Sequence, residues 1–256
     1  MKVTFLGTGT SQGVPIIACD CMVCSSSNKR DKRLRSSILL QTNERNIVVD
    51  TGPDFREQML VSGIRHLDAI LFTHAHRDHL AGLDDIRGFN FIMKRAIDVY
   101  CEEWVEKSIR SEFHYAFNEP KYPGVPEMNL HRIGLDQFEL FGTQIQPIRV
   151  LHHKLPVLGF RLGEFVYITD ANAISEEEKE KIKGCKYLVL NALRREKHIS
   201  HFTLDEAVQL IQELNPEQAY LTHISHQLGL HDEVENELPN NIHLAYDGLA
   251  IDFNAG

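Results

Sequence analysis

The stretch Leu71-Phe72-Thr73-His74-Ala75-His76-Arg77-Asp78-His79 decides the fold of this 256-residue chain. It closes an apolar run that predicts a buried strand, and it brings three histidines and one aspartate within a few positions. In extended chain His74 and His76 project to the same side and can bind one metal ion, while Asp78 and His79 can face a second. Two divalent ions about 3.5 to 4 Å apart share a water and lower its pKa, so the stretch predicts a hydrolytic metal centre. The alternative is a solvated turn in which Asp78 caps a helix.

Other metal-binding side chains come directly after short apolar runs. They are Asp170, His223, and one of the two neighbours His152 and His153. Ligands in α/β sheets collect where the carboxyl ends of strands meet, so we expect these side chains to converge on the histidine-rich stretch. The additional ligands disfavour the solvated-turn alternative.

The composition is that of an ordinary globular protein, with 43% hydrophobic and 25% charged residues. No linker or repeat interrupts the chain, so a single domain over residues 1–256 is expected. The formal net charge of -9 disfavours nucleic acid as a partner, and the local basic run 29–35 is expected to be a solvated loop. No apolar run is long enough to span a membrane, and glycines and polar residues at 7–13 replace a signal-peptide core. We therefore expect a cytoplasmic protein without membrane contacts, and a homodimer is compatible with the sequence.

Strand and helix patterns alternate along the chain. Short β-branched runs predict strands at 3–6, 37–40, 47–50, 69–73, 144–150, 165–169, 187–191 and 218–222. Helical spacing predicts helices at 55–61, 102–111, 175–183 and 203–214, the last two beginning with capping boxes at Ser175 and Thr203. A turn at 42–45 indicates a hairpin, and the proline-rich 118–126 indicates a surface excursion. This order predicts a layered α/β protein with mixed sheets.

Three of the five cysteines form a second cluster of potential ligands: Cys19, Cys21 and Cys24. They are one ligand short of a tetrahedral zinc site, and His226, three residues past His223, is a candidate for the fourth. The alternative is a reduced, partly buried cysteine cluster. Cys101 and Cys185 stand alone near predicted strands and are expected in the core.

The strand followed by H-x-H-x-D-H resembles the signature of the metallo-β-lactamase superfamily, and the resemblance extends over the whole chain. It implies an αββα four-layer sandwich, in which two mixed β-sheets lie face to face with helices outside and a dinuclear site at one edge. It also implies one set of ligands for each ion and a shared aspartate: His74, His76 and His152 for the first, Asp78, His79 and His223 for the second, and Asp170 as the bridge. The family pattern aligns with His152, although spacing alone leaves His153 open.

Three further motifs are similar to the PhnP-type branch of that superfamily, which resembles ribonuclease Z. They are Gly-Thr-Gly-Thr-x-x-Gly-Val-Pro at 7–15, the C-x-C-x2-C cluster, and Leu-Thr-His-Ile-Ser-His-Gln at 221–227. The branch implies phosphodiesterases acting on cyclic phosphates of ribose, with a structural zinc on Cys19, Cys21, Cys24 and His226. His201 stands before a predicted helix and matches a phosphate-contacting histidine, with the helix N–H groups beside it. His198 either assists or is merely exposed, and Asp50 is expected to orient a ligand histidine.

Together these motifs predict a metal-dependent phosphodiesterase for a small phosphorylated substrate. A hydroxide bridging two ions is expected to attack phosphorus, with Asp78 and Asp170 fixing the ions and His201 stabilising charge or protonating the leaving oxygen. The expected cofactors are two catalytic divalent ions, zinc or manganese, and one structural zinc. Two alternatives use the same site: a tRNA 3'-processing nuclease, and hydrolysis of a carbon ester, thioester or lactone.

Overall fold

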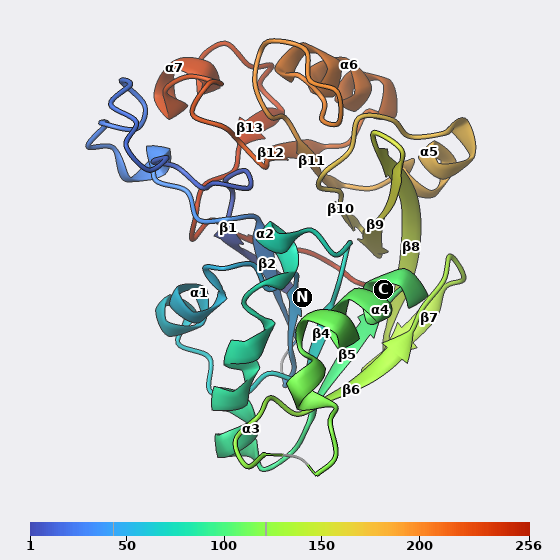
Figure 1. The fold of residues 1–256 in the computed structure, drawn as a ribbon. Helices are drawn as coiled ribbons and strands as arrows, with labels where there is room; N and C mark the ends of the chain where they lie inside the picture. Colours follow the sequence, from blue (N-terminus) through green and yellow to red (C-terminus); the bar gives the residue numbers. More distant parts are fainter. Residues whose placement is uncertain (43, 121) are drawn as a thin grey trace.

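Two seven-stranded sheets lie face to face in the computed structural model, which describes residues 1–42, 44–120 and 122–256 (Figure 1). The first sheet has the order β14 (Ala250–Asp252), β1 (Lys2–Gly7), β2 (Ser37–Gln41), β3 (Asn46–Val49), β4 (Ala69–Leu71), β5 (Ile97–Cys101) and β6 (Met128–Arg132). The second has the order β13 (Ile242–Leu244), β12 (Gln218–Thr222), β11 (Tyr187–Asn191), β10 (Phe165–Tyr167), β9 (Leu155–Leu162), β8 (Thr143–His152) and β7 (Phe138–Leu140). Each sheet contains parallel and antiparallel pairs, so both are mixed, as predicted.

Helices cover the outer face of each sheet (Figure 1). On the first sheet these are α1 (Phe55–Ser62), α2 (Arg77–Leu80), α3 (Arg87–Met93) and α4 (Glu103–Glu112). On the second they are α5 (Glu176–Ile182), α6 (Leu204–Leu214) and α7 (His231–Glu235). Short 3-10 turns occupy Lys29–Asp31, Leu83–Ile86 and His114–Ala116. The αββα sandwich expected from the resemblance is confirmed. None of the helices in the described ranges has the length and apolar character needed to cross a bilayer.

Alternating side chains divide the core into layers. In β3, Ile47 and Val49 pack between the sheets, whereas Val48 packs under the helices of the first sheet. In β10, Phe165 packs between the sheets and Val166 packs outward under the other helices. Strands buried on both faces read as continuous apolar runs, which is why the sequence revealed them. Cys101 and Cys185 are buried in these layers, as predicted.

The predicted strands and helices are all present, with small shifts at their ends, but several elements were missed. The clearest miss is β9, because its Pro156 and Gly159 are typical of turns. A Cβ at Gly159 would lie 2.9 Å from the carbonyl oxygen of Tyr167, so the close approach of β10 requires glycine there. A tertiary contact therefore outweighs the local signal.

Two local expectations need correction. Thr203 and Glu206 form the predicted capping box, but at Ser175 only the serine caps, because the Glu178 carboxylate accepts from Arg149 N and from Lys181. The basic run 29–35 is not a solvated loop throughout, since Arg33 is 4% exposed. Its guanidinium donates hydrogen bonds to Thr8 Oγ1 and to the carbonyl oxygen of Ala245, and it contacts His231.

The predicted hairpin is formed by β2 and β3, which pair antiparallel. Residue 43, within its turn, and residue 121, within the proline-rich excursion, lie outside the described residues. Around the latter, Glu119, Pro120 and Tyr122 are exposed, as expected of a surface segment.

Glycines let the histidine-rich stretch dock closely on the first sheet. Thr51 N donates to His79 O at 2.7 Å, and Gly82 N donates to Thr51 O at 2.8 Å. A Cβ at Gly52 would lie 2.0 Å from Asp78 O, and one at Gly82 would lie 2.1 Å from Gly52 O. The position of Asp78 therefore depends on the absence of side chains at both glycines.

Gly52→Ala should lower the free energy of unfolding by about 1 to 3 kcal/mol, because the added methyl must push the Asp78 backbone away. Denaturant unfolding measures the change, and Gly134→Ala is the matched control, since nothing lies within 4 Å of its added Cβ. A Gly52→Ala protein as stable as the parent would contradict this close packing.

Candidate metal centre

The predicted ligands lie at the end of β8 or in the loops that follow β4, β10 and β12, and they come close together in the structure. Three strand-end residues there have left-handed backbone, with φ of 63° at Asp50, 53° at Asp170 and 56° at His223. This conformation costs L residues roughly 1 to 2 kcal/mol. All three are nearly fully buried, so packing and hydrogen bonds hold the strained backbone and aim the side chains at the centre.

The ligands expected for the second ion form one compact group: Asp78, His79, Asp170 and His223, with ligand atoms all within 4.8 Å of one another. His79 Nε2 lies 3.2 Å from Asp78 Oδ2 and 3.1 Å from Asp170 Oδ2. His223 Nδ1 lies 3.1 Å from the same Asp170 oxygen. Asp170 thus has the central position that a bridging ligand needs.

The rings of the ligands expected for the first ion lie beside that group, but among the described residues the ligand atoms of His74 and His76 join no group within 4.8 Å. The ligand atom of His152 groups instead with those of Asp170 and His201. The His76 ring centroid lies 4.6 Å from that of His74 and 5.1 Å from that of His152. His152 is buried and its Nδ1 lies 2.8 Å from Ser200 O, which leaves Nε2 free for an ion. His153 is exposed on the following turn, with φ 57°, and does not join the cluster.

Three buried ring nitrogens in this cluster make no well-directed hydrogen bond to any described residue: His74 Nε2, His79 Nε2 and His223 Nδ1. Of these, His79 Nε2 and His223 Nδ1 have carboxylate oxygens 3.1 to 3.2 Å away. A buried polar atom without a partner is costly, and such atoms in native proteins need an explanation. Ring nitrogens and carboxylates are the ligands that Zn²⁺ and similar divalent ions take. The donor set therefore fits divalent ions.

The opposite nitrogen of each of these rings is held by a neighbour. His74 Nδ1 lies 2.9 Å from Thr73 Oγ1, His79 Nδ1 lies 2.7 Å from Asp50 Oδ2, and His223 Nε2 lies 3.3 Å from Thr10 Oγ1. Metal-ligating histidines characteristically use their second nitrogen in this way, which fixes the ring orientation. Sequence reasoning missed both threonines, although Thr73 directly precedes a ligand and Thr10 lies in the glycine-rich motif.

Asp50 is a buried carboxylate in contact with His79 Nδ1, which is where the predicted orienting role requires it. It also accepts hydrogen bonds from Thr73 N at 2.9 Å and Thr73 Oγ1 at 2.7 Å. Burial raises the pKa of Asp50. Burial alone would lower the pKa of His79, but the carboxylates of Asp170, Asp78 and Asp50 raise it well above its usual value. The surrounding carboxylates thus favour positive charge beside His79 Nε2, and a bound divalent ion would supply that charge in place of the ring proton.

His201 lies at the edge of the centre, with Nε2 3.0 Å from Asp170 Oδ1. Its ring stacks on His223 at a centroid distance of 4.8 Å, and its Nδ1 lies 3.1 Å from His198 Nδ1, so His198 is not merely exposed. Some of the helix N–H groups expected to assist His201 have other partners. Leu204 N donates to Arg194 O, Thr203 N donates to the Glu206 carboxylate, and Glu206 N donates to Thr203 Oγ1.

The cysteine cluster assembles with the predicted fourth residue. His226 Nδ1 lies 3.4 Å from Cys19 Sγ, 3.3 Å from Cys21 Sγ and 3.6 Å from Cys24 Sγ. The backbone N–H of Cys24 and the His226 ring lower the pKa of the Cys21 thiol to about 6, whereas burial raises that of Cys24 to about 11. Three sulfurs and one ring nitrogen that lie within 4.8 Å of one another match the donor set of a tetrahedral zinc site.

Comparison with known proteins identifies the family. Residues 45–224 match the family described as "Beta-lactamase superfamily domain", and the chain belongs to it. The crystal structure of a diphosphatase from the PhnP family shares 40% sequence identity at a TM-score of 0.93, covering 99% of this chain and 98% of that chain. Zn²⁺-bound PqqB from Methylobacterium extorquens has a TM-score of 0.78 at 19% identity, covering 99% of this chain and 100% of that one, and shows the fold alone. The metallo-β-lactamase fold and the likeness to the PhnP family, inferred from the motifs, are thus confirmed. The fold implies divalent metal ions.

Among curated relatives, an octanoyltransferase of Porphyromonas gingivalis is 42% identical over 252 residues, which cover 97% of this chain and 51% of the relative. A ribonuclease Z of Thermosynechococcus vestitus is 27% identical over 170 residues, which cover 64% of this chain and 37% of the relative. The chain therefore spans about half, or less, of the length of these two relatives.

Asp50→Asn should weaken zinc binding at the centre about 10-fold to 100-fold, the usual effect of losing the partner that orients a ligand histidine. Competition with a chromogenic chelator measures this affinity. The control is Asp98→Asn on β5, whose carboxylate contacts Asn129 and His131 at the surface. Equal affinity in the Asp50→Asn and parent proteins would refute the orienting role.

Proposed function

We propose that this chain is a dinuclear metal-dependent phosphodiesterase that hydrolyses a small phosphodiester, such as a cyclic phosphate of ribose. The single observation that carries the proposal is the juxtaposition of His201 with Asp170 at 3.0 Å, beside three unpartnered ring nitrogens. The nitrogens supply the metal ligands, and His201 supplies a hydrogen-bond donor next to them. A hydrolytic site for phosphate esters needs both features.

The chain's own residues have distinct tasks in this reaction. His74, His76 and His152 would hold one ion, Asp78, His79 and His223 the other, and Asp170 would lie between them. Two such ions, zinc or manganese, would lower the pKa of a water and polarise a phosphoryl oxygen. His201 Nε2 then donates a hydrogen bond to the charge that develops on phosphate, or gives its proton to the leaving oxygen. Cys19, Cys21, Cys24 and His226 would hold a structural zinc.

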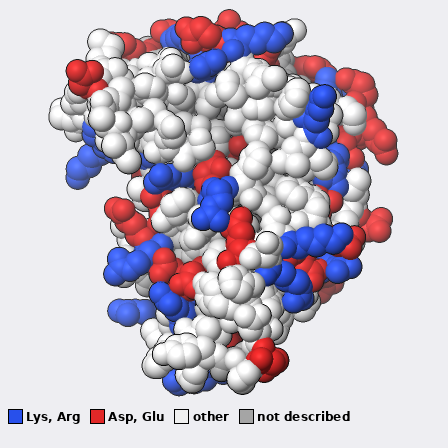
Figure 2. Space-filling model, viewed as in Figure 1, with Lys and Arg blue, Asp and Glu red and all other residues white. Residues whose placement is uncertain are grey.

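The similarity to a PhnP-family diphosphatase supports phosphorus rather than carbon as the atom under attack. The name of the Porphyromonas gingivalis relative concerns octanoyl transfer, but this chain spans only about half of that protein. Lysines and arginines alternate with acidic residues on the face seen in Figure 2, without a continuous basic stripe. Since RNA-binding surfaces are basic, this face and the formal net charge of -9 support a small substrate over a tRNA precursor.

We also propose that residues 1–256 act as a single hydrolase domain. The family match covers 45–224, but β1 and β14, which lie outside it, pair with each other and extend the first sheet. The sheet that carries Asp50 therefore uses chain from both ends of the sequence.

A substrate panel tests the reaction class. Zinc-loaded and manganese-loaded protein should hydrolyse bis(p-nitrophenyl) phosphate and a 2',3'-cyclic nucleotide at least about 10-fold faster than a thioester or a lactone, because only phosphodiesters match His201 and its site. A tRNA precursor is also a phosphodiester, but it should be cleaved at least about 10-fold more slowly because the formal net charge of -9 disfavours a long RNA. Preferential turnover of the thioester or lactone would replace this proposal with the carbonyl alternative, and preferential cleavage of the tRNA precursor would replace it with the nuclease alternative.

His201→Ala should reduce kcat about 10²-fold to 10⁴-fold, as expected when a group that donates a proton or hydrogen bond in the transition state is removed. Bound metal should be unchanged. His114→Ala, which alters an exposed histidine, is the matched control. Elemental analysis accompanies the kinetics, because loss of a metal equivalent in His201→Ala would make this residue a ligand and not a donor.

A further inference from the structure

Residues 223–226 carry a predicted ligand of a different metal site at each end. His223 Nδ1 faces Asp170 at 3.1 Å, and His226 Nδ1 faces Cys21 Sγ at 3.3 Å. Only three peptide units separate the two histidines, a span of at most about 11 Å in extended chain. The intervening Ile224 and Ser225 are buried. A movement of His226 is therefore expected to move His223 as well, because the segment between them is short and buried.

The same segment is held by the glycine-rich turn of the N-terminus. Ile224 N donates to Thr8 O at 2.9 Å, and Thr10 N donates to Ile224 O at 3.1 Å. The Thr10 side chain then contacts His223 Nε2 at 3.3 Å, the nitrogen opposite the one that faces Asp170. Thr10 thus sets the position of His223 through both its backbone and its hydroxyl.

That turn is also the base of the cysteine-bearing loop. Val14 and Arg33 exchange backbone hydrogen bonds of 2.8 and 2.7 Å, which close a loop that contains all three cysteines of the cluster. Thr8 Oγ1 donates to Asp247 Oδ1 at 2.7 Å and accepts from Arg33 Nη1 at 2.9 Å.

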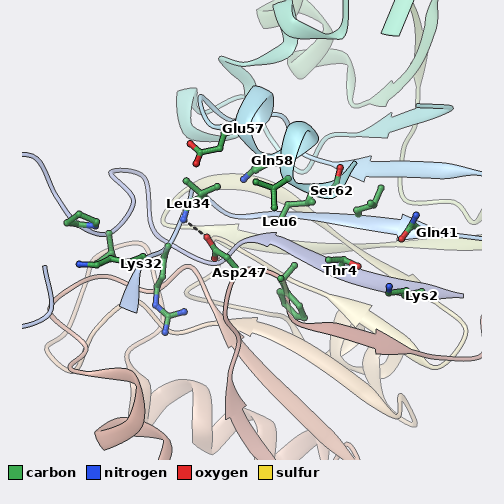
Figure 3. Close-up of a pocket in the computed structure, with 17 residues that line it drawn as sticks. Lys2, Thr4, Leu6, Lys32, Leu34, Gln41, Glu57, Gln58, Ser62 and Asp247 are labelled. Atoms are coloured by element: carbon green, nitrogen blue, oxygen red, sulfur yellow. Dashed lines mark hydrogen bonds between the residues drawn. The ribbon is translucent and has the colours of Figure 1, made fainter. Parts of the chain in front are cut away.

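The Asp247 carboxylate holds both the glycine-rich turn, through Thr8, and the end of the cysteine-bearing loop, through Leu34. Its second oxygen accepts from Leu34 N at 2.6 Å, the contact drawn in Figure 3 beside a cavity of about 630 Å³. The residues that line this cavity include none of the predicted ligands. Two sets of contacts thus link the cysteine-bearing loop to His223. One runs through His226 and the chain between 226 and 223, and the other runs through Thr10 of the glycine-rich turn.

We propose that the Cys19, Cys21, Cys24 and His226 cluster positions His223, so that zinc in the cluster raises the affinity of the catalytic centre for its second ion. Zinc at the cluster would join the cysteine-bearing loop to His226. Residues 223–226 would then be held at one end by the zinc and at the other by Thr10. Without zinc, His226 is held only by its contacts with the three thiols. The position of His223 then depends mainly on Thr10. By thermodynamic linkage the second catalytic ion must strengthen zinc binding at the cluster by the same factor. This inference rests on the metal centre of the proposed function.

Zinc competition against a graded series of chelators tests the coupling on the metal-stripped full-length chain. The parent should bind three zinc ions. Cys21→Ser should lose the cluster zinc and also hold the second catalytic ion about 10-fold more weakly. Thr10→Val should keep the cluster zinc but weaken the same catalytic ion about 10-fold to 100-fold, the range for loss of a ligand's outer partner. Thr4→Val, on strand β1 just before the glycine-rich turn, and Cys185→Ala, a cysteine outside the cluster, are the matched controls and should retain parent affinities within about twofold.

Three zinc ions in the parent, with catalytic affinities unchanged in both variants, would overturn the coupling and leave the proposed function intact. A parent that binds zinc only at the cluster would overturn the metal centre and this coupling with it.

If circular dichroism shows that Cys21→Ser does not fold, cobalt titration of the parent is used instead. The histidine-site cobalt should then bind about 10-fold more tightly to protein with a cobalt-filled cluster than to protein whose cluster thiols have been alkylated, and equal affinity in the two would contradict the proposal.

Discussion

The structure depends on a group of buried imidazole nitrogens that make no well-directed hydrogen bond to the described part of the chain. His74 Nε2, His79 Nε2 and His223 Nδ1 lie in the interior without hydrogen-bond partners among the described residues, around the Asp170 carboxylate. A fold does not retain such atoms for stability, because each buried, unpaired polar atom costs about 1 to 3 kcal/mol. Divalent ions would satisfy these nitrogens and neutralise the carboxylates together, which explains why both kinds of side chain meet here.

The two sheets serve this group by bringing strand ends from distant parts of the chain to one edge. Asp50, Asp170 and His223 all adopt left-handed backbone at these ends, so the sandwich bears conformational strain where the side chains must turn inward. The fully buried layers between and outside the sheets provide the rigid frame that holds this strain. Thr73, Asp50 and Thr10 then fix the ring orientations, so the ligands are in position before an ion arrives.

The sequence predicted most of the residues in this site, because strand ends and H-x-H-x-D-H spacing are local features. The face-to-face arrangement of the sheets came from the family resemblance. Contacts between distant residues were not predictable. Thr10 meets a histidine 213 positions away, and Arg194 O takes the Leu204 N–H that seemed available to phosphate. The Glu178 carboxylate accepts a hydrogen bond from Arg149 N and does not complete the predicted capping box. Gly159 lies in a strand because β10 passes too close for a side chain. In each case a tertiary contact outweighs a local preference.

Anomalous diffraction from crystals of the zinc-loaded protein tests the dinuclear centre most directly. The account predicts two zinc peaks about 3.5 to 4 Å apart, with His74, His76 and His152 around one, Asp78, His79 and His223 around the other, and Asp170 between them. A centre without zinc, or a single zinc held by Asp170, His152 and His201 while His74 Nε2 stays unpartnered, would contradict it.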